Sequence, residues 1–170
     1  MSAILQSLAR LRVPLGFLCG AVAVALARPT PASLAAGGGI AALGEAVRVW
    51  ASGHIEKGRE VTRTGPYRFV RHPLYLGSAI MGAGFVVAAR SVTVAFIVSI
   101  YVIVTSIAAI RTEESALDAR FAGEYAAYRS GRAEPVARPF SVARVVSNRE
   151  YRAAVGLVLG MSLLYLRSLL

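Results

Sequence analysis

The chain has 170 residues, enough for a single domain, and 56% of them are hydrophobic. Together with its positive mean hydropathy, this is too apolar for a soluble domain of that size, and the long uncharged runs predict transmembrane helices. The net charge of +10 lies in the segments between those runs, so nucleic-acid binding is a weak interpretation. A single cysteine, Cys19, excludes an intrachain disulfide.

Two apolar runs precede the first polar segment. Residues 13–27, with a start near Ile4, predict a membrane helix, although residues 25–27 also resemble a signal-peptide cleavage site. Arg28-Pro29 directly afterwards makes cleavage unattractive. Residues 32–52 predict a second membrane helix whose many small residues suit close packing. Glu45 and Arg48 within it, spaced i, i+3, indicate either an interfacial ion pair or a site role.

The stretch 65–77 (GPYRFVRHPLYLG) is chemically the richest of the chain. It follows the basic segment 53–64 and holds one of only two histidines beside arginines, tyrosines and prolines. Pro73 fits the first turn of a helix, so we expect a third membrane helix over 74–89. Gly82 and Gly84 in that helix are typical either of helix packing or of close backbone approach to a ligand.

A short turn at Arg90-Ser91 leads into a fourth membrane helix, predicted over 92–110. We expect that helix to end at the polar residues 111–114 and an amphipathic helix to follow along the membrane face. The apolar side of the amphipathic helix holds Leu117, Phe121, Tyr125 and Tyr128. A final apolar run predicts a fifth membrane helix at about 153–169. The predicted fold class is therefore an all-α integral membrane protein, a single domain over 1–170 with about five transmembrane helices.

The distribution of basic residues predicts the orientation of these helices. The 52–73 loop holds five arginines and lysines and the 111–152 loop holds eight, whereas the two short turns hold one each. The positive-inside rule then puts the N-terminus and both long loops in the cytoplasm. We expect the protein in a bacterial-type inner or plasma membrane.

The short turn at 90–91 makes the third and fourth membrane helices antiparallel neighbours. The start of one and the end of the other then lie side by side, which places His72 and Tyr75 near Glu113 and Glu114. Such a cluster can hold a positively charged small molecule between carboxylates and aromatic faces. It can equally serve as an interfacial anchor, with Glu113 capping the next helix, and the residue types alone do not separate the two interpretations.

These residues resemble a known family. The motif at 65–77, an apolar hairpin, Glu113-Glu114 and the spacing L-x-x-x-F-x-x-x-Y-x-x-Y are similar to the isoprenylcysteine carboxyl methyltransferases, whose core is shared by membrane phospholipid methyltransferases. The resemblance covers about residues 42–129. It implies an integral membrane methyltransferase that uses S-adenosylmethionine, with no Rossmann domain and no metal.

The resemblance also implies the residues of the cofactor pocket. It assigns to the cofactor the backbone near 59–62, a Gly-x-Gly and the residues of the 65–77 stretch and of the acid pair: Val61, Tyr67, His72, Pro73, Leu74, Tyr75, Gly82, Gly84, Glu113 and Glu114. Arg71 and Arg111 are candidate substrate-binding residues. Ala109 departs from the pattern, because animal prenylcysteine enzymes have a substrate-binding arginine there.

The implied function is methyl transfer to a lipophilic acceptor that comes from the bilayer, such as the carboxylate of an isoprenylcysteine-like compound. The alternative acceptor is the ethanolamine headgroup of a phospholipid. An amine acceptor must lose a proton first, and His72, Glu114 and Tyr75 are equal candidates for that base, so no catalytic residue is assigned. A membrane reductase that uses NADPH and a non-catalytic membrane protein are the other classes that fit. Membrane lipids are expected partners, and the oligomeric state stays open.

Overall fold

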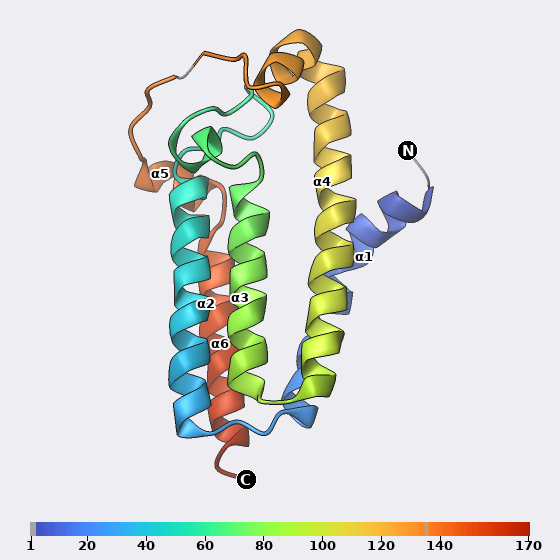
Figure 1. The fold of residues 1–170 in the computed structure, drawn as a ribbon, viewed down its shortest axis with the longest axis vertical. Coiled ribbons are helices and arrows are strands. Elements are labelled where there is room, and N and C mark those ends of the chain that lie inside the picture. Colours follow the sequence, from blue (N-terminus) through green and yellow to red (C-terminus); the bar gives the residue numbers. More distant parts are fainter. Residues whose placement is uncertain (1–2, 135) are drawn as a thin grey trace.

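The computed structural model describes residues 3–134 and 136–170 of the chain. Over these residues the chain forms only helices, in agreement with the predicted all-α class (Figure 1). The elements in chain order are α1 (Ala3–Leu26), α2 (Pro31–Ser52), the 3₁₀ helix η1 (Gly65–Arg68), α3 (Pro73–Ala89), α4 (Val92–Arg129), α5 (Val142–Ser147) and α6 (Tyr151–Arg167).

Helix α2 begins at a capping box formed by Thr30 and Ser33. The Ser33 amide donates to Thr30 Oγ1 at 3.2 Å, and the Thr30 amide donates to Ser33 Oγ at 2.9 Å. The Ser33 hydroxyl also donates to the carbonyl of Ala88 at 3.0 Å, which ties the start of α2 to the end of α3. The cap therefore sets the register of the α2–α3 pair at this end of the bundle.

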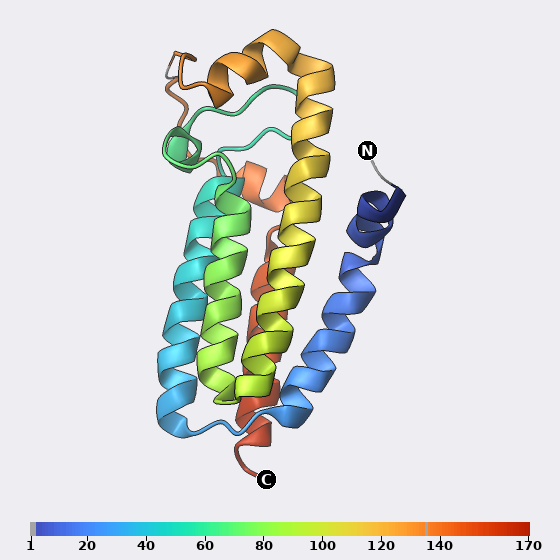
Figure 2. The same ribbon diagram turned by 45° about the vertical axis from the view of Figure 1, so that its right-hand side comes forward.

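Helices α2 and α3 pack along their whole length through glycine (Figures 1 and 2). A β-carbon at Gly37 would lie 2.4 Å from the carbonyl oxygen of Gly84, and one at Gly44 would lie 2.6 Å from that of Gly77. Real β-carbons do not approach backbone so closely, so only glycine lets the two helices touch. The prediction of close helix packing by small residues is confirmed for this pair.

Helix α4 runs unbroken through the polar residues 111–114, so the predicted end of the fourth helix there is wrong. No glycine or proline interrupts residues 92–122, and the Thr112 hydroxyl folds back onto the Ala108 carbonyl at 2.8 Å, so polar side chains alone do not end the helix. The helix instead bends at Phe121, whose φ of −131° and ψ of 38° are not helical. Beyond the bend, the last turns of α4 fold over the end of the bundle (Figure 2).

Helix α6 closes the other side of the bundle, where it packs against α2 (Figure 1). The expected ion pair between Glu45 and Arg48 is present at 3.7 Å. Arg48 Nε lies closer to Glu150 Oε1, at 2.7 Å, just before α6 begins. Arg48 also donates to Ser78 Oγ at 2.5 Å, so one side chain joins α2, α3 and the start of α6.

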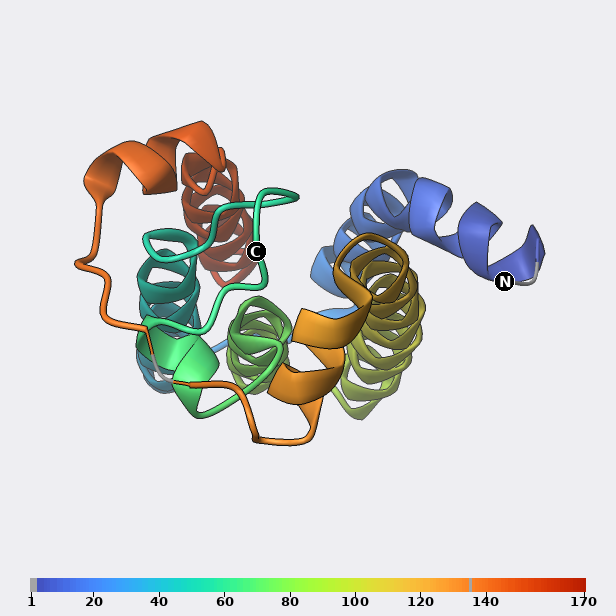
Figure 3. The same cartoon turned by 90° about the horizontal axis from the view of Figure 1, so that it is seen from above.

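The two long basic loops lie at the same end of the bundle, and the short turns with Arg28 and Arg90 lie at the opposite end (Figures 1 and 3). Among the described residues, α4 is the one helix long and apolar enough by itself to cross a membrane. Val13–Leu26 and Pro73–Ala89 are shorter apolar helices.

Candidate functional site

The 65–77 stretch crosses the basic end of the bundle as the 3₁₀ helix η1 followed by the start of α3. Gly65 has a φ of +56°, which turns the chain into η1, and Tyr67 in η1 is buried. Tyr128, beyond the bend of α4, donates its hydroxyl to the Tyr67 carbonyl at 2.7 Å. The bend in α4 therefore brings the last turns of that helix onto η1.

Glu114 is the centre of the polar network at this end. Its Oε1 accepts from His72 Nε2 at 3.0 Å, from the Tyr125 hydroxyl at 3.0 Å and from Arg71 Nη1 at 3.4 Å. The hydrogen bond from His72, followed by that from Tyr125, holds the pKa of Glu114 below its ordinary value although burial acts in the opposite direction. The predicted proximity of His72 to the acid pair is confirmed.

The phenols that face this network are held neutral. Burial, and then the hydrogen bond to Glu114, raise the pKa of Tyr125. Burial also raises the pKa of Tyr128 to about 12. Burial raises the pKa of Tyr67 as well, and the neighbouring Glu113 adds to that effect. At neutral pH these three tyrosines therefore carry no charge, and Tyr125 and Tyr128 donate hydrogen bonds.

A narrow cleft of about 10 Å³ opens beside the network. Seven side chains line it: Tyr67, Arg71, His72, Pro73, Leu74, Tyr75 and Glu113. Among the described residues the buried hydroxyl of Tyr67 has no hydrogen-bond partner, and Glu113 makes no hydrogen bond or ion pair. An unpaired buried polar group costs about 1–3 kcal/mol, so a hydrogen-bonding ligand in the cleft would relieve that cost at the Tyr67 hydroxyl, beside the half-buried carboxylate of Glu113. A cleft of this size must widen to admit one.

The remaining predicted site residues lie elsewhere. Val61 is buried in the loop before η1, outside the cleft lining. Gly82 faces Val102 of α4, and Gly84 contacts the backbone of α2, so both serve helix packing roughly three turns below His72. Arg111 is exposed and makes no ion pair with a described residue.

The sequence did not single out Tyr125 and Tyr128 as site residues. Both lie on the apolar face after residue 114, whose spacing by itself predicts an amphipathic helix along the membrane. In a straight helix, Glu114 and Tyr125 would lie about 16 Å apart along the axis. The bend at Phe121 brings the two residues together, and the sequence pattern did not predict that bend.

The site is thus an acidic and aromatic cleft at the polar end of a helical bundle, suited to a small cation that also carries hydrogen-bonding groups. The family model for phospholipid methyltransferases matches residues 37–124, about half of the chain, from α2 into the last part of α4. The chain belongs to the phospholipid methyltransferase family, and this membership implies methyltransferase activity. Comparisons with curated proteins and with solved structures found no match.

Proposed function

We propose that the protein is an integral membrane methyltransferase that uses S-adenosylmethionine to methylate the amine of a phospholipid headgroup. In this proposal α1, α2, α3, α4 and α6 cross the bilayer, and the cleft lies at its cytoplasmic face. The family match is the main support for the reaction class, and the acceptor is taken from the name of that family. Each element of the proposal has its own support in the described residues.

The distribution of side chains by size supports a membrane location. The buried hydrophobic residues are mostly small, such as Ala41, Ala88 and Ala108. Large apolar side chains instead cover the outside of α1, α4 and α6: Phe17, Leu18, Phe96, Ile100, Ile103, Val158, Leu159 and Leu163 are all more than half exposed. This arrangement is unfavourable in water and favourable in lipid, where helices associate through small residues. The two basic loops at one end favour the cytoplasmic side for the cleft.

The single observation that carries the cofactor assignment is the pair of unpartnered polar groups in the cleft. The Tyr67 hydroxyl can donate a hydrogen bond and the Glu113 carboxylate can accept one. A cofactor that carries both an amino acid part and a ribose has groups that match each of them. The rings of Tyr67 and Tyr75 add aromatic surface that attracts a cation. S-adenosylmethionine, when bound, supplies an electrophilic methyl group on a sulfonium sulfur.

His72 is the candidate base within this proposal. An ammonium acceptor has to lose a proton before its nitrogen can attack a methyl group. When His72 Nε2–H donates to Glu114, the lone pair of the neutral imidazole is on Nδ1 and can accept that proton. Glu114 holds the ring in this tautomer and stabilises the imidazolium that forms.

A carboxylate acceptor of the isoprenylcysteine type is the second candidate, because the 65–77 motif resembles that family too. Two observations weigh against it. Ala109 stands where those enzymes have an arginine, and it is buried. The nearest arginine, Arg111, is exposed, so it can bind a carboxylate only in the headgroup region.

Calorimetric titration of detergent-purified protein with S-adenosylhomocysteine tests the donor site. We expect saturable binding that weakens at least tenfold in His72→Ala and in Glu113→Ala. Glu134→Ala, which removes an exposed carboxylate on the same face, is the matched control and should bind like the wild type. Unchanged affinity in both cleft variants would refute the assignment, and binding of NADPH in place of this ligand would favour a reductase.

Mass spectrometry of lipids after incubation with isotopically labelled S-adenosylmethionine tests the acceptor. A labelled methylated ethanolamine headgroup is the expected product. A labelled methyl ester on a prenylcysteine probe would instead select the carboxylate acceptor. This assay is independent of the site variants, so it separates an error about the acceptor from an error about the donor site.

A further inference from the structure

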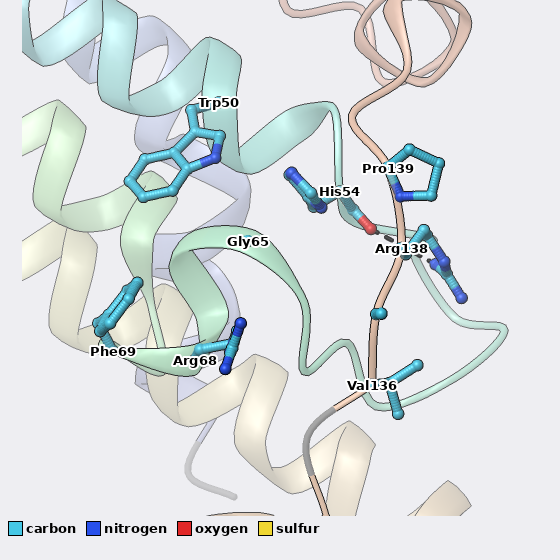
Figure 4. Close-up of a pocket in the computed structure, with 9 residues that line it drawn as sticks. Trp50, His54, Gly65, Arg68, Phe69, Val136, Arg138 and Pro139 are labelled. Carbon is cyan, nitrogen blue, oxygen red and sulfur yellow. Dashed lines mark hydrogen bonds between the residues drawn. The ribbon is translucent and has the colours of Figure 1, made fainter.

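A second pocket, of about 460 Å³, also borders η1 and shares no lining residue with the cleft. Figure 4 shows Trp50, His54, Arg68 and Phe69 around this pocket, with residues 136–139 as its outer wall. Tyr67 of η1 lines the cleft, whereas the next residues, Arg68 and Phe69, line the pocket. The volume is within the range of small-molecule sites.

The outer wall is held in place by hydrogen bonds to the end of α2. The Ser141 amide donates to the Gly53 carbonyl at 3.1 Å, and Arg144 Nε donates to the same oxygen at 2.7 Å. Arg138 Nη1 donates to the His54 carbonyl at 3.5 Å, and this bond is drawn in Figure 4. Phe140 packs its ring edge-on to His54, with ring centroids 6.2 Å apart. The pocket is therefore a built feature of the fold.

His54 presents an unpartnered nitrogen at this pocket. The side chain is 6% exposed, and its Nδ1 is paired with Thr64 Oγ1 at 3.2 Å. Its Nε2 has no partner among the described residues, and Figure 4 shows the ring pointing towards Trp50. Gly65 packs closely against the His54 ring: a β-carbon at position 65 would lie 2.4 Å from the imidazole. Burial, followed by Arg144 and Arg138, lowers the pKa of His54, so the ring is neutral and acts as a hydrogen-bonding group.

The free positive charge of the pocket comes from Arg68. Arg138 is already paired with Glu60 at 2.5 Å and with Glu56 at 3.6 Å. Arg68 is exposed and makes no ion pair with any described residue. Trp50 is 43% exposed and Phe69 is 79% exposed, which is typical of side chains at a membrane interface. The pocket therefore combines one free cation and one free imidazole nitrogen with an apolar rim.

We propose that this pocket binds the phosphate of an anionic phospholipid, at a site separate from the one where methyl transfer takes place. Arg68 pairs with the phosphate, and His54 donates from Nε2–H when Thr64 donates to Nδ1. The glycerol backbone and the first part of the acyl chains lie against Trp50 and Phe69. The placement of the lipid follows from the pocket alone, and only its separation from the methyl-transfer site rests on the proposed function.

Native mass spectrometry of delipidated full-length protein tests the proposal, with dioleoyl phosphatidylglycerol as the anionic probe and dioleoyl phosphatidylcholine as the zwitterionic one. We expect the anionic lipid to bind at least tenfold more tightly. Arg68→Gln should weaken that binding about tenfold. Arg132→Gln removes an exposed arginine from the same end of the bundle, whose side chain is paired among the described residues only with Ser130, and should change the affinity less than twofold.

Four results would overturn the proposal. Equal losses in Arg68→Gln and Arg132→Gln would mean non-specific attraction to a basic surface. Equal affinity for the two lipids would remove the anionic selectivity, and full competition by millimolar inorganic phosphate would identify a site for the free ion. S-adenosylhomocysteine affinity of Arg68→Gln distinguishes this pocket from the donor site: it should be unchanged, and its loss would make the pocket part of the cofactor site.

Discussion

Replacing Glu114 with glutamine tests the network that joins α4 to the start of α3. Glutamine keeps the shape of the side chain but removes the charge that accepts three hydrogen bonds on one oxygen, from His72, Tyr125 and Arg71. It also introduces an amide NH₂ that faces other donors. We expect Glu114→Gln to fold and to be less stable than the wild type, because two elements far apart in the chain lose their shared acceptor.

The size of the effect follows from the exposure of each partner. The Arg71 side chain is 48% exposed, so its ion pair contributes about 0.5 kcal/mol or less. The bonds from His72, whose side chain is 14% exposed, and from buried Tyr125 contribute about 1 kcal/mol each. The total is about 2 kcal/mol, which lowers the melting temperature of a chain of this size by about 4–8 °C.

Thermal unfolding in detergent, followed by circular dichroism at pH 7, measures this difference. Glu134→Gln is the matched control, since its carboxylate is exposed and makes no ion pair with a described residue. The folded-state pKa of Glu114 is lowered from its ordinary 4.5, so its stabilisation is complete above that value and is lost as the pH falls through the folded-state pKa. The two melting curves should therefore converge in acid. An unchanged melting temperature at pH 7, or a gap that widens in acid, would refute the reasoning.

Two further substitutions separate packing from ligand binding. Tyr67→Phe removes a buried hydroxyl that has no partner among the described residues, so the free protein should keep its stability or gain up to about 1 kcal/mol. Calorimetry should show weaker binding of S-adenosylhomocysteine. A clear loss of stability would mean that the hydroxyl has a structural role. Gly37→Ala should cost about 2 kcal/mol or more in thermal unfolding, because its β-carbon meets the backbone of α3, whereas Gly39→Ala has open space and should stabilise α2 by up to about 1 kcal/mol. Similar shifts in the two glycine variants would contradict the packing of α2 on α3.

The proximity of His72 to Glu114 was predictable because it needed only connectivity. A two-residue turn at 90–91 makes the adjoining helices run antiparallel, so the start of the third helix and the far part of the fourth lie at the same end of the bundle. The distribution of basic residues separately put the two basic loops at one end of the bundle, as the structure has them (Figure 3). Connectivity alone had a limit. It could not extend past residue 114, where the chain continues as a helix and the turn no longer constrains it.

The acid at position 150 shows a second limit of the sequence. The i, i+3 spacing of Glu45 and Arg48 predicted their ion pair. The closer partner of Arg48 is nevertheless Glu150, about a hundred residues further along the chain. No local pattern indicates a partner at that separation. The contact matters because α6 lies outside the family match, and this ion pair joins the start of α6 to the matched core.

The sequence by itself determined where the long apolar helices lie, which residue types gather at each end of the bundle, and that the motif at 65–77 meets the acid pair. These properties depend on composition, periodicity and short turns, which act over a few residues. Only the tertiary structure decided that α4 bends at Phe121 and that Tyr125 and Tyr128 return to η1. It also decided that Gly84 packs against α2, because a glycine has the same local signal whether its neighbour is a ligand or another helix.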